Sequence, residues 1–231
     1  VKALLARYTA RPVGARVTLT AGVTDVVRIH RHLKDELGFA EVGFAPVTTA
    51  DRSVFNLNAE ELRQVFEGLK ELGREYLDAA LEGRNTGFSN MHQLLSDFTE
   101  GTAKSLPCGA GIGLLAVASD GDITLCHRFT GSDLPTFGNV NTGWDRDAAR
   151  SFVERAANRH DTGCGKCWIR KLCAGGCYHE AYARHADPLH PNVHYCELMR
   201  DWVEFGLSVY AQIKQRNPQF IDRHVAPRRA H

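Results

Sequence analysis

The stretch CGKCWIRKLCAGGC, residues 164–177, places four cysteines at the spacing Cys-x2-Cys-x5-Cys-x3-Cys. Thiolates two or three residues apart on a turn can reach one metal centre. The two glycines before the last cysteine let the backbone pass close to a bulky inorganic core without a Cβ clash. The stretch therefore predicts a metal centre in the second half of the chain.

Three further cysteines extend the pattern on both sides. Twelve residues separate Cys108 from Gly121, four separate Gly121 from Cys126, and eighteen separate Cys177 from Cys196. The number of cysteines, seven, is odd, and none of them precedes Cys108. The first residues of the chain do not follow the pattern of a secretory signal. We therefore expect a cytoplasmic location, where thiols seldom pair as structural disulfides, and metal ligation in place of scattered core cysteines.

Ligand chemistry alone leaves the metal open. Cys-x2-Cys pairs are common in zinc ribbons, where four ligands close a tetrahedron. Seven thiolates fill two zinc sites only if a histidine such as His127 joins them. The count favours iron–sulfur clusters, but soft thiolates suit both metals, so a zinc-stabilised structural domain stays an alternative.

The first half of the chain alternates strand and helix patterns. The expected elements are strand 16–20, helix 23–39, strand 40–47 and a long helix from residue 58. Asn58 followed by Glu61 is a capping box, and Gly83 is a natural helix end. The alternation predicts parallel β/α units that form either the end of a barrel or part of an open sheet. Two units cannot close a barrel by themselves. A complete small α/β domain is the alternative, although its two strands would leave both sheet edges exposed.

A second domain is expected to start near residue 100. The helical signal ends in the stretch 83–90, after which glycines and cysteines become dense. Asp120-Gly121 between two apolar runs predicts a hairpin that folds Cys126 back toward Cys108. A final helix is expected from Cys196, and the last residues, PRRAH, have no pattern and are expected to be mobile. The predicted division is residues 1–100, residues 101–216 and a tail of residues 217–231.

Composition excludes some functions. The chain has 231 residues and a formal charge of +1, with its basic residues scattered. It has no electrostatic footprint for nucleic acid and no apolar run long enough to span a membrane, so we expect neither partner. The chain begins with VKALLARYTARP, without an initiator Met, and reads like a helix entered midway. We interpret it as a part of a longer protein whose N-terminal portion lies outside this sequence.

The whole pattern, C-x12-G-x4-C, gap, C-x2-C-x5-C-x3-C, gap, C, resembles the seven-cysteine motif of the SPASM domain in radical S-adenosylmethionine peptide-modifying enzymes. The resemblance implies an α/β plus small α+β fold. In it, the last β/α units of a partial (β/α) barrel precede a cysteine-rich iron–sulfur domain with a β-hairpin and a C-terminal helix.

The resemblance also implies two auxiliary [4Fe-4S] clusters. The ligands carried over for the outer cluster are Cys164, Cys167, Cys173 and Cys196, and those for the inner cluster are Cys108, Cys126 and Cys177. Two cubanes have eight iron corners, so one corner of the inner cluster lacks a cysteine. Water, His127 or a substrate thiolate are the candidates for that corner.

Three segments narrow the resemblance to one group. CHRFTGSDLPTFGNV, CAGGCYHEAYARHADP and HYCELMRDWVEFGLSVY are most similar to the maturation enzyme of quinohemoprotein amine dehydrogenase. That group implies an oxidoreductase that forms thioether cross-links in a peptide or small protein substrate. It implies S-adenosylmethionine and a third [4Fe-4S] cluster in the complete enzyme, and an electron donor such as a flavodoxin or ferredoxin.

One departure from the family limits this chain. The C-x3-C-x2-C triplet that binds the cluster cleaving S-adenosylmethionine does not occur in the sequence, so the chain alone is expected to be inactive. We assign no residue to S-adenosylmethionine. A noncatalytic iron–sulfur electron-transfer or peptide-binding module is the alternative function.

Three polar residues beside the cysteines remain to be interpreted. His127 stands where some family members place an acidic residue thought to act as a base, and an imidazole can accept a proton at neutral pH. The alternative is a histidine hydrogen-bonded at the rim of a cluster. His179 and Glu180 suit a helix start near a cluster, but ordinary polar surface is the commoner role for such residues.

Overall fold

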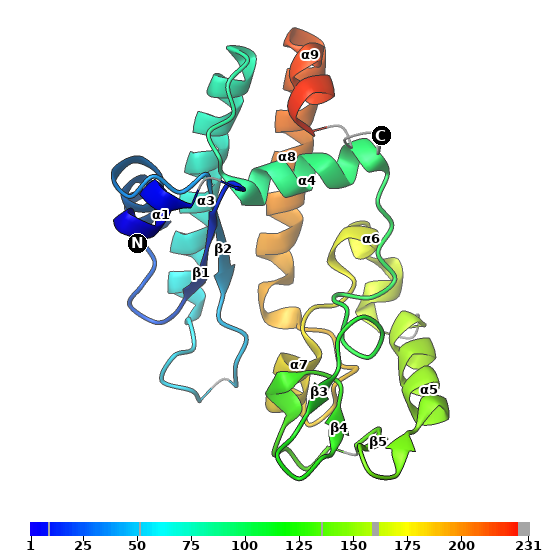
Figure 1. Ribbon diagram of the computed structural model, residues 1–231. Helices are drawn as coiled ribbons and strands as arrows, with labels where there is room; N and C mark the ends of the chain where they lie inside the picture. Colours follow the sequence, from blue (N-terminus) through cyan, green and yellow to red (C-terminus); the bar gives the residue numbers. More distant parts are fainter. Residues whose placement is uncertain (9, 51, 135, 159–161, 226–231) are drawn as a thin grey trace. The chain divides into compact units, whose positions relative to one another are not determined.

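The computed structural model describes residues 1–8, 10–50, 52–134, 136–158 and 162–225 (Figure 1). Two compact units divide the chain. Unit 1 comprises Val1–Val47, Arg52–Thr102 and Tyr195–His231, and unit 2 comprises Thr48–Asp51 and Ala103–His194. Among the described residues, no helix is long and apolar enough to cross a membrane. The predicted division at residues 101 and 217 stays a prediction, since the units follow packing and are not continuous in sequence.

Unit 1 contains the predicted β/α alternation. Its first elements are α1 (Lys2–Arg7), β1 (Gly14–Leu19), α2 (Val26–Arg31), the π-helix η1 (His32–Glu36) and β2 (Glu41–Pro46). β1 and β2 pair in parallel, from Gly14 opposite Glu41 to Leu19 opposite Pro46. A parallel bridge between Val42 and Phe88 adds one residue at the other edge of β2. The mixed α/β character is therefore confirmed, and the described sheet has two strands.

The long helix α3 (Ala59–Leu81) begins at the predicted capping box. The Asn58 side chain accepts hydrogen bonds from the backbone N–H groups of Glu60 and Glu61, at 2.9 and 3.0 Å. The Glu61 carboxylate accepts in return from the Asn58 N–H at 2.9 Å, so the start of the helix is fixed from both sides. The buried side of the helix carries Leu62, Val65, Phe66, Leu69, Leu72 and Tyr76.

A helix that the sequence pattern did not predict follows it. The end of the helical signal at residues 83–90 is wrong, because α4 spans Ser89–Glu100 and ends at Gly101 with φ 64°. Met91, Leu94 and Leu95 are buried at helical spacing. No side chain caps the start of α4, so it begins without the sequence signal that marks α3.

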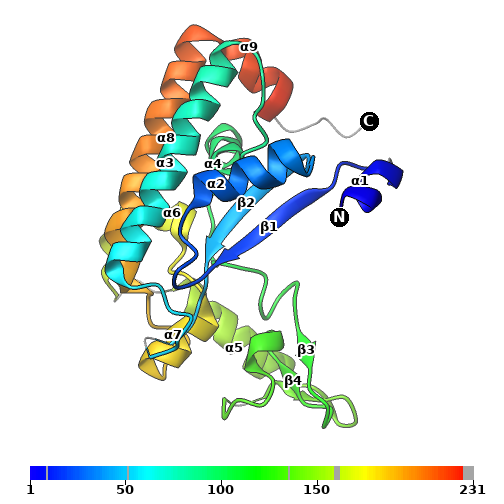
Figure 2. The same cartoon turned by 90° about the vertical axis from the view of Figure 1, so that its left-hand side faces the viewer.

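The final helix belongs to unit 1. The predicted helix from Cys196 is confirmed as α8 (Cys196–Arg216), and it lies alongside α3 (Figure 2). Two glycines permit close helix packing: a Cβ on Gly73 would lie 2.5 Å from the Phe205 ring, and one on Gly206 would lie 2.2 Å from Leu94. Unit 1 therefore joins segments from both ends of the chain through one helical layer.

The predicted tail is helical in its described part. The short helix α9 (Pro218–Phe220) and the π-helix η5 (Ile221–Val225) follow α8. The Phe220 ring meets the Tyr76 ring edge-on at 5.8 Å. The Asn217 amide donates to the Ala80 carbonyl at 2.9 Å. These contacts attach the segment to α3, while the residues expected to be mobile, 227–231, lie outside the described residues.

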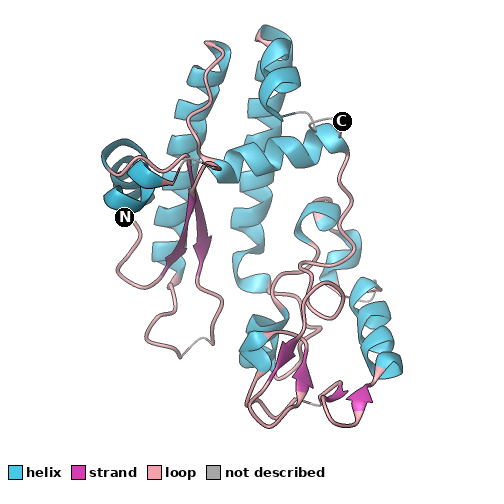
Figure 3. Cartoon of the chain, in the orientation of Figure 1, coloured by secondary structure: helices cyan, strands magenta, loops and turns pink. Residues whose placement is uncertain are grey.

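Unit 2 consists mainly of loops and short elements (Figure 3). They are β3 (Ala116–Val117), β4 (Ile123–Thr124), the 3-10 helix η2 (His127–Phe129), β5 (Gly138–Asn139), β6 (Gly143–Trp144), α5 (Arg146–Ala157), the 3-10 helix η3 (Gly163–Lys166), α6 (Arg170–Cys173) and α7 (Tyr178–His185). A further 3-10 helix, η4 (Val193–Tyr195), leads into α8. β3 and β4 form the predicted antiparallel hairpin, and Gly121 adopts φ 89° in its turn.

A small hydrophobic core holds unit 2 together. Its buried members are Ala110, Leu125, Phe129, Phe152, Ala156 and Tyr178, and Cys126 packs against them. The Phe152 and Tyr178 rings meet edge-on at 5.2 Å. The core joins the segment after β4 to α5 and to the start of α7. The backbone positions of Cys126 and Cys177 therefore depend on this core.

Candidate metal centre

Short helical turns fix the backbone of the four cysteines in residues 164–177. Cys164 lies in η3, and the Cys167 N–H donates to the Cys164 carbonyl at 3.1 Å. Cys173 is the last residue of α6, where its N–H donates to the Ile169 carbonyl at 3.0 Å. Cys177 precedes α7, and its carbonyl accepts from the Ala181 N–H at 3.0 Å. Cys164 and Cys167 thus share one turn, whereas Cys173 and Cys177 each lie within or beside another.

The loop between Cys173 and Cys177 has an unusual backbone. Ala174, Gly175 and Gly176 all have positive φ, at 54°, 94° and 85°. Glycine adopts this conformation without a Cβ penalty, whereas an alanine pays on the order of 1 kcal/mol for it. Asn192, which is 3% exposed, holds the loop through its N–H to the Gly175 carbonyl at 3.1 Å and its amide to the Cys177 carbonyl at 3.0 Å. Strained backbone that needs such support is concentrated at functional sites.

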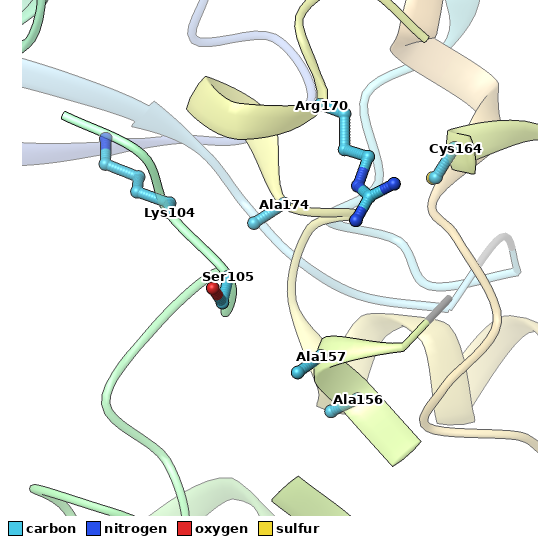
Figure 4. Close-up of a pocket in the computed structure, with 7 residues that line it drawn as sticks. All are labelled: Lys104, Ser105, Ala156, Ala157, Cys164, Arg170 and Ala174. Atoms are coloured by element: carbon cyan, nitrogen blue, oxygen red, sulfur yellow. The ribbon is translucent and has the colours of Figure 1, made fainter. Parts of the chain in front are cut away.

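A small pocket adjoins Cys164 (Figure 4). Its volume is about 30 Å³, and it is lined by Lys104, Ser105, Ala156, Ala157, Cys164, Arg170 and Ala174. Figure 4 shows the Arg170 guanidinium extending from α6 on the side of the pocket where Cys164 lies. A guanidinium near a thiolate ligand is favourable because charge-assisted hydrogen bonds to the anion are the strong ones.

The remaining cysteines come from three other segments. Cys126 is partly buried and directly precedes η2, two residues after the end of β4. Cys108 is exposed and precedes a turn in which the Gly109 carbonyl accepts from the N–H groups of residues 112–114. Cys196 is the first residue of α8 and so belongs to unit 1. No two of the seven cysteines, all of which lie in the described part of the chain, are joined by a disulfide bond.

The donor set agrees with iron–sulfur chemistry. Within the described residues, no group of three or more His, Cys, Asp or Glu side chains is placed to hold a single metal ion. Thiolates that share a cubane bind separate iron corners and need not converge on one point. Seven thiols without a disulfide therefore fit such clusters by their chemistry, and the division of these ligands between two clusters stays a prediction.

His127 lies among basic side chains. It is the exposed first residue of η2, followed by Arg128, whose guanidinium donates to the Thr48 hydroxyl. Burial lowers the pKa of His179, and the charges of Arg128 and His127 lower it further. The Nδ1 atom of His179 is buried and has no hydrogen-bond partner in the described structure, and its ring meets Phe129 edge-on at 5.3 Å. A catalytic role for His127 stays a prediction.

Sequence reasoning missed a buried charge cluster on α7. Glu180 is 1% exposed, and its Oε1 lies 3.4 Å from Arg184 Nε and 3.4 Å from His194 Nε2. The surface role that is commoner for such a residue is therefore wrong for Glu180, because the same side of α7 buries Tyr178 and Ala181. The i,i+4 spacing of Glu180 and Arg184 is the signal that could have revealed the pair.

Comparisons with known proteins find similarity to solved structures. No family model matches it, and no curated protein matches it. The solved structure "Native anSMEcpe with bound AdoMet" is similar, with a TM-score of 0.66 and 19% identity over 87% of this chain and 56% of that one. "Native anSMEcpe with bound AdoMet and Cp18Cys peptide" gives a TM-score of 0.62 and 19% identity over 88% of this chain and 57% of that one.

These similarities show a shared fold. The chain spans just over half the length of the proteins that it matches. The resemblance that the cysteine motif predicted, to a family that uses S-adenosylmethionine, is confirmed at the level of the fold. The partial barrel and the details of the cysteine-rich domain stay predictions.

Proposed function

We propose that the chain is the C-terminal part of a radical S-adenosylmethionine oxidoreductase that forms thioether cross-links in a peptide or small protein. One observation carries the proposal: four cysteines on successive short turns, around the strained loop 174–176, occur in a fold shared with AdoMet-bound structures. Assignment as a part of a longer enzyme agrees with the 56% of the similar chain that this chain covers.

The cysteines are proposed to hold two [4Fe-4S] clusters, which supply one-electron transfer when bound. Cys164, Cys167, Cys173 and Cys196 are proposed for the outer cluster, and Cys108, Cys126 and Cys177 for the inner one. The chain's own residues prepare this ligand set. Arg170 places a positive charge at the pocket of Cys164, and Asn192 fixes the carbonyl of Cys177.

The proposed partner is a peptide. Two of the structures with this fold are described as holding the Cp18Cys and Kp18Cys peptides, which supports a peptide partner here. Forming a carbon–sulfur bond from a thiol and a C–H group removes two hydrogen atoms, that is, two electrons and two protons. Cleavage of one S-adenosylmethionine to methionine and 5′-deoxyadenosine would take up both electrons, with one proton released. A flavodoxin or ferredoxin would supply the electron that starts this cleavage, and a bound cluster would receive the electron left when the bond forms.

A second function is favoured by one sequence observation. The chain contains no C-x3-C-x2-C triplet, so it agrees equally with an iron–sulfur module that transfers electrons or binds a peptide without radical chemistry. A zinc-stabilised structural domain is the third candidate, since cysteine thiolates also suit zinc. The three candidates differ in metal content and in what the sequence before Val1 contains.

The experiment compares this chain with a longer form that includes the residues encoded before Val1. Both are reduced under anaerobic conditions and mixed with S-adenosylmethionine and a cysteine-containing peptide. The chain alone is expected to release no 5′-deoxyadenosine. The longer form is expected to release it and to give a peptide lighter by two hydrogen atoms in the mass spectrum, and a serine-containing peptide is the matched control. Release of 5′-deoxyadenosine with both peptides left unmodified would refute peptide cross-linking.

A further inference from the structure

Unit 2 contains an apolar cavity that none of the metal chemistry uses. Its volume is about 360 Å³, within the range of roughly 300–1,000 Å³ typical of ligand pockets. Its walls include the apolar side chains of Leu125, Phe129, Leu134, Phe137, Phe152 and Pro188. We call it the aromatic pocket. It lies between the segment after β4, the residues before β5 and helix α5.

The walls of the aromatic pocket are well supported. The Phe137 and Phe152 rings meet edge-on at 6.0 Å, and Phe152 meets Tyr178 edge-on at 5.2 Å. Phe129 and Phe152 belong to the buried core of unit 2, so the floor of the pocket is the core itself. Edge-on aromatic contacts favour a defined geometry, so these rings give the pocket a defined apolar wall.

Arg155 places a cation at the rim of the aromatic pocket. Arg155 lines the pocket from α5 and forms no ion pair in the part of the chain that the structure describes. Two other arginines of α5 differ from it: Arg150 lies 3.5 Å from Asp147, and Arg146 lies over the Trp144 ring at 6.0 Å. An apolar cavity with a guanidinium at its rim is complementary to an apolar group that carries a carboxylate.

The surroundings of Arg155 favour a chain-like ligand over a small acid. Arg155 also lines a second, open hollow of about 530 Å³, together with the carboxylates of Glu154 and Asp187 and the polar side chains of Asn158 and His190. Pro188 lines the aromatic pocket, and its neighbours on either side, residues 187 and 189, line the hollow. A ligand seated in the pocket can therefore continue past Arg155 along a polar surface, as an extended peptide does.

We propose that the aromatic pocket binds a large apolar side chain of a peptide and that Arg155 binds a carboxylate next to that side chain in the peptide. The choice of a peptide rests on the proposed function, while the binding itself requires no cysteine and no S-adenosylmethionine. The pocket is thus a docking site for the partner, apart from the residues proposed to hold the clusters.

The test uses the reconstituted full chain without reductant or S-adenosylmethionine. Fluorescein-labelled ten-residue peptides of glycine and serine carry Phe-Glu, Phe-Gln or Ser-Glu at their centre, and anisotropy reports binding. The Phe-Glu peptide is expected to bind about tenfold more tightly than either of the others, because it alone fills the pocket and pairs with the guanidinium. Equal binding of the Phe-Glu and Ser-Glu peptides would overturn the proposal.

Matched variants locate the binding. Arg155→Gln is expected to weaken binding of the Phe-Glu peptide about tenfold and to leave the affinity for the Phe-Gln peptide unchanged. Arg150→Gln lies on the same helix but outside the pocket lining, so it is expected to leave the affinity for both peptides unchanged. Ala148→Phe fills the cavity and is expected to abolish binding of both peptides. If that variant fails to fold, Ser151→Phe at the exposed rim serves as a second variant that blocks the pocket. Unchanged binding in a folded block variant would refute the site.

Two further outcomes separate the inference from the proposed function. A free apolar acid, 4-phenylbutyrate, is expected to compete far more weakly than the Phe-Glu peptide. Competition as tight as that of the peptide would overturn the peptide assignment. If peptides bind in this way but the longer form leaves them unmodified, the docking site stands and the proposed reaction fails. If cross-linking occurs and Arg155→Gln has no effect on binding, the docking site fails alone.

Discussion

Replacing Glu180 with glutamine removes the carboxylate that contacts both Arg184 and His194 in a buried charge cluster, while keeping the shape of the side chain. Glu180 is 1% exposed, the Arg184 side chain is 5% exposed, and the two ions lie 3.4 Å apart. Removing one partner of a buried pair costs about 3–5 kcal/mol, because the charge that stays buried loses that partner's compensation. His194 is 25% exposed on its side chain, and the contacts are long, so we expect the free energy of unfolding to fall by about 2–4 kcal/mol.

The matched control is Glu60→Gln, which also removes a glutamate that pairs with an arginine on a helix. The Glu60–Arg63 pair is 2.7 Å long, but both side chains are more than half exposed, so no measurable change is expected. Urea unfolding followed by circular dichroism measures both variants, and hydrogen exchange in peptides that cover α7 locates the effect. If Glu180→Gln were as stable as Glu60→Gln, the buried pair would not support unit 2 and the reasoning would be refuted.

Three other perturbations test local features of the fold. Gly87→Ala is expected to destabilise the chain more than Gly83→Ala in urea unfolding, since both glycines have φ near 80° but only a Cβ at Gly87 meets the Ala40 carbonyl oxygen, at 2.6 Å. Ala186→Gly is expected to stabilise by about 1 kcal/mol in the same assay, because Ala186 ends α7 with φ 55° and is exposed; destabilisation would contradict this strain. Burial lowers the pKa of His30 below 6.5, so the unfolded chain binds more protons than the folded one and stability is lost as the pH falls below about 6.5. His30→Gln should flatten that dependence of the unfolding midpoint on pH, and an unchanged slope would refute the assignment.

Elements with local signals could be predicted from the sequence. The capping box at Asn58 and Glu61 and the turn at Gly121 each depend on a few adjacent residues. The parallel pairing of β1 with β2 follows from the alternation of strand and helix. By contrast, α4 has no side-chain cap, and its buried residues become evident only once α8 packs on them. Signals from adjacent residues therefore predicted individual elements, whereas contacts between residues far apart in the sequence determine which elements pack together.

The candidate site divides in the same way. Cysteine spacing identified the ligand set, because thiol chemistry depends on residue type and distance along the chain. The support for that set could not be predicted. Asn192 holds the loop after Cys173 from a position fifteen residues beyond Cys177, and nothing in its neighbours indicates this role. The aromatic pocket also has no motif, since its walls come from separate segments.

Iron and sulfide content tests the central claim most directly. After anaerobic reconstitution, the wild-type chain is expected to hold about eight irons and eight sulfides, the content of two [4Fe-4S] clusters. Cys108→Ala and Cys164→Ala should each retain about four irons, because they remove ligands of different clusters, whereas Ser105→Ala, in the pocket lining beside Cys164, should retain about eight. Zinc in place of iron and sulfide, or a full complement of iron in both cysteine variants, would contradict the account.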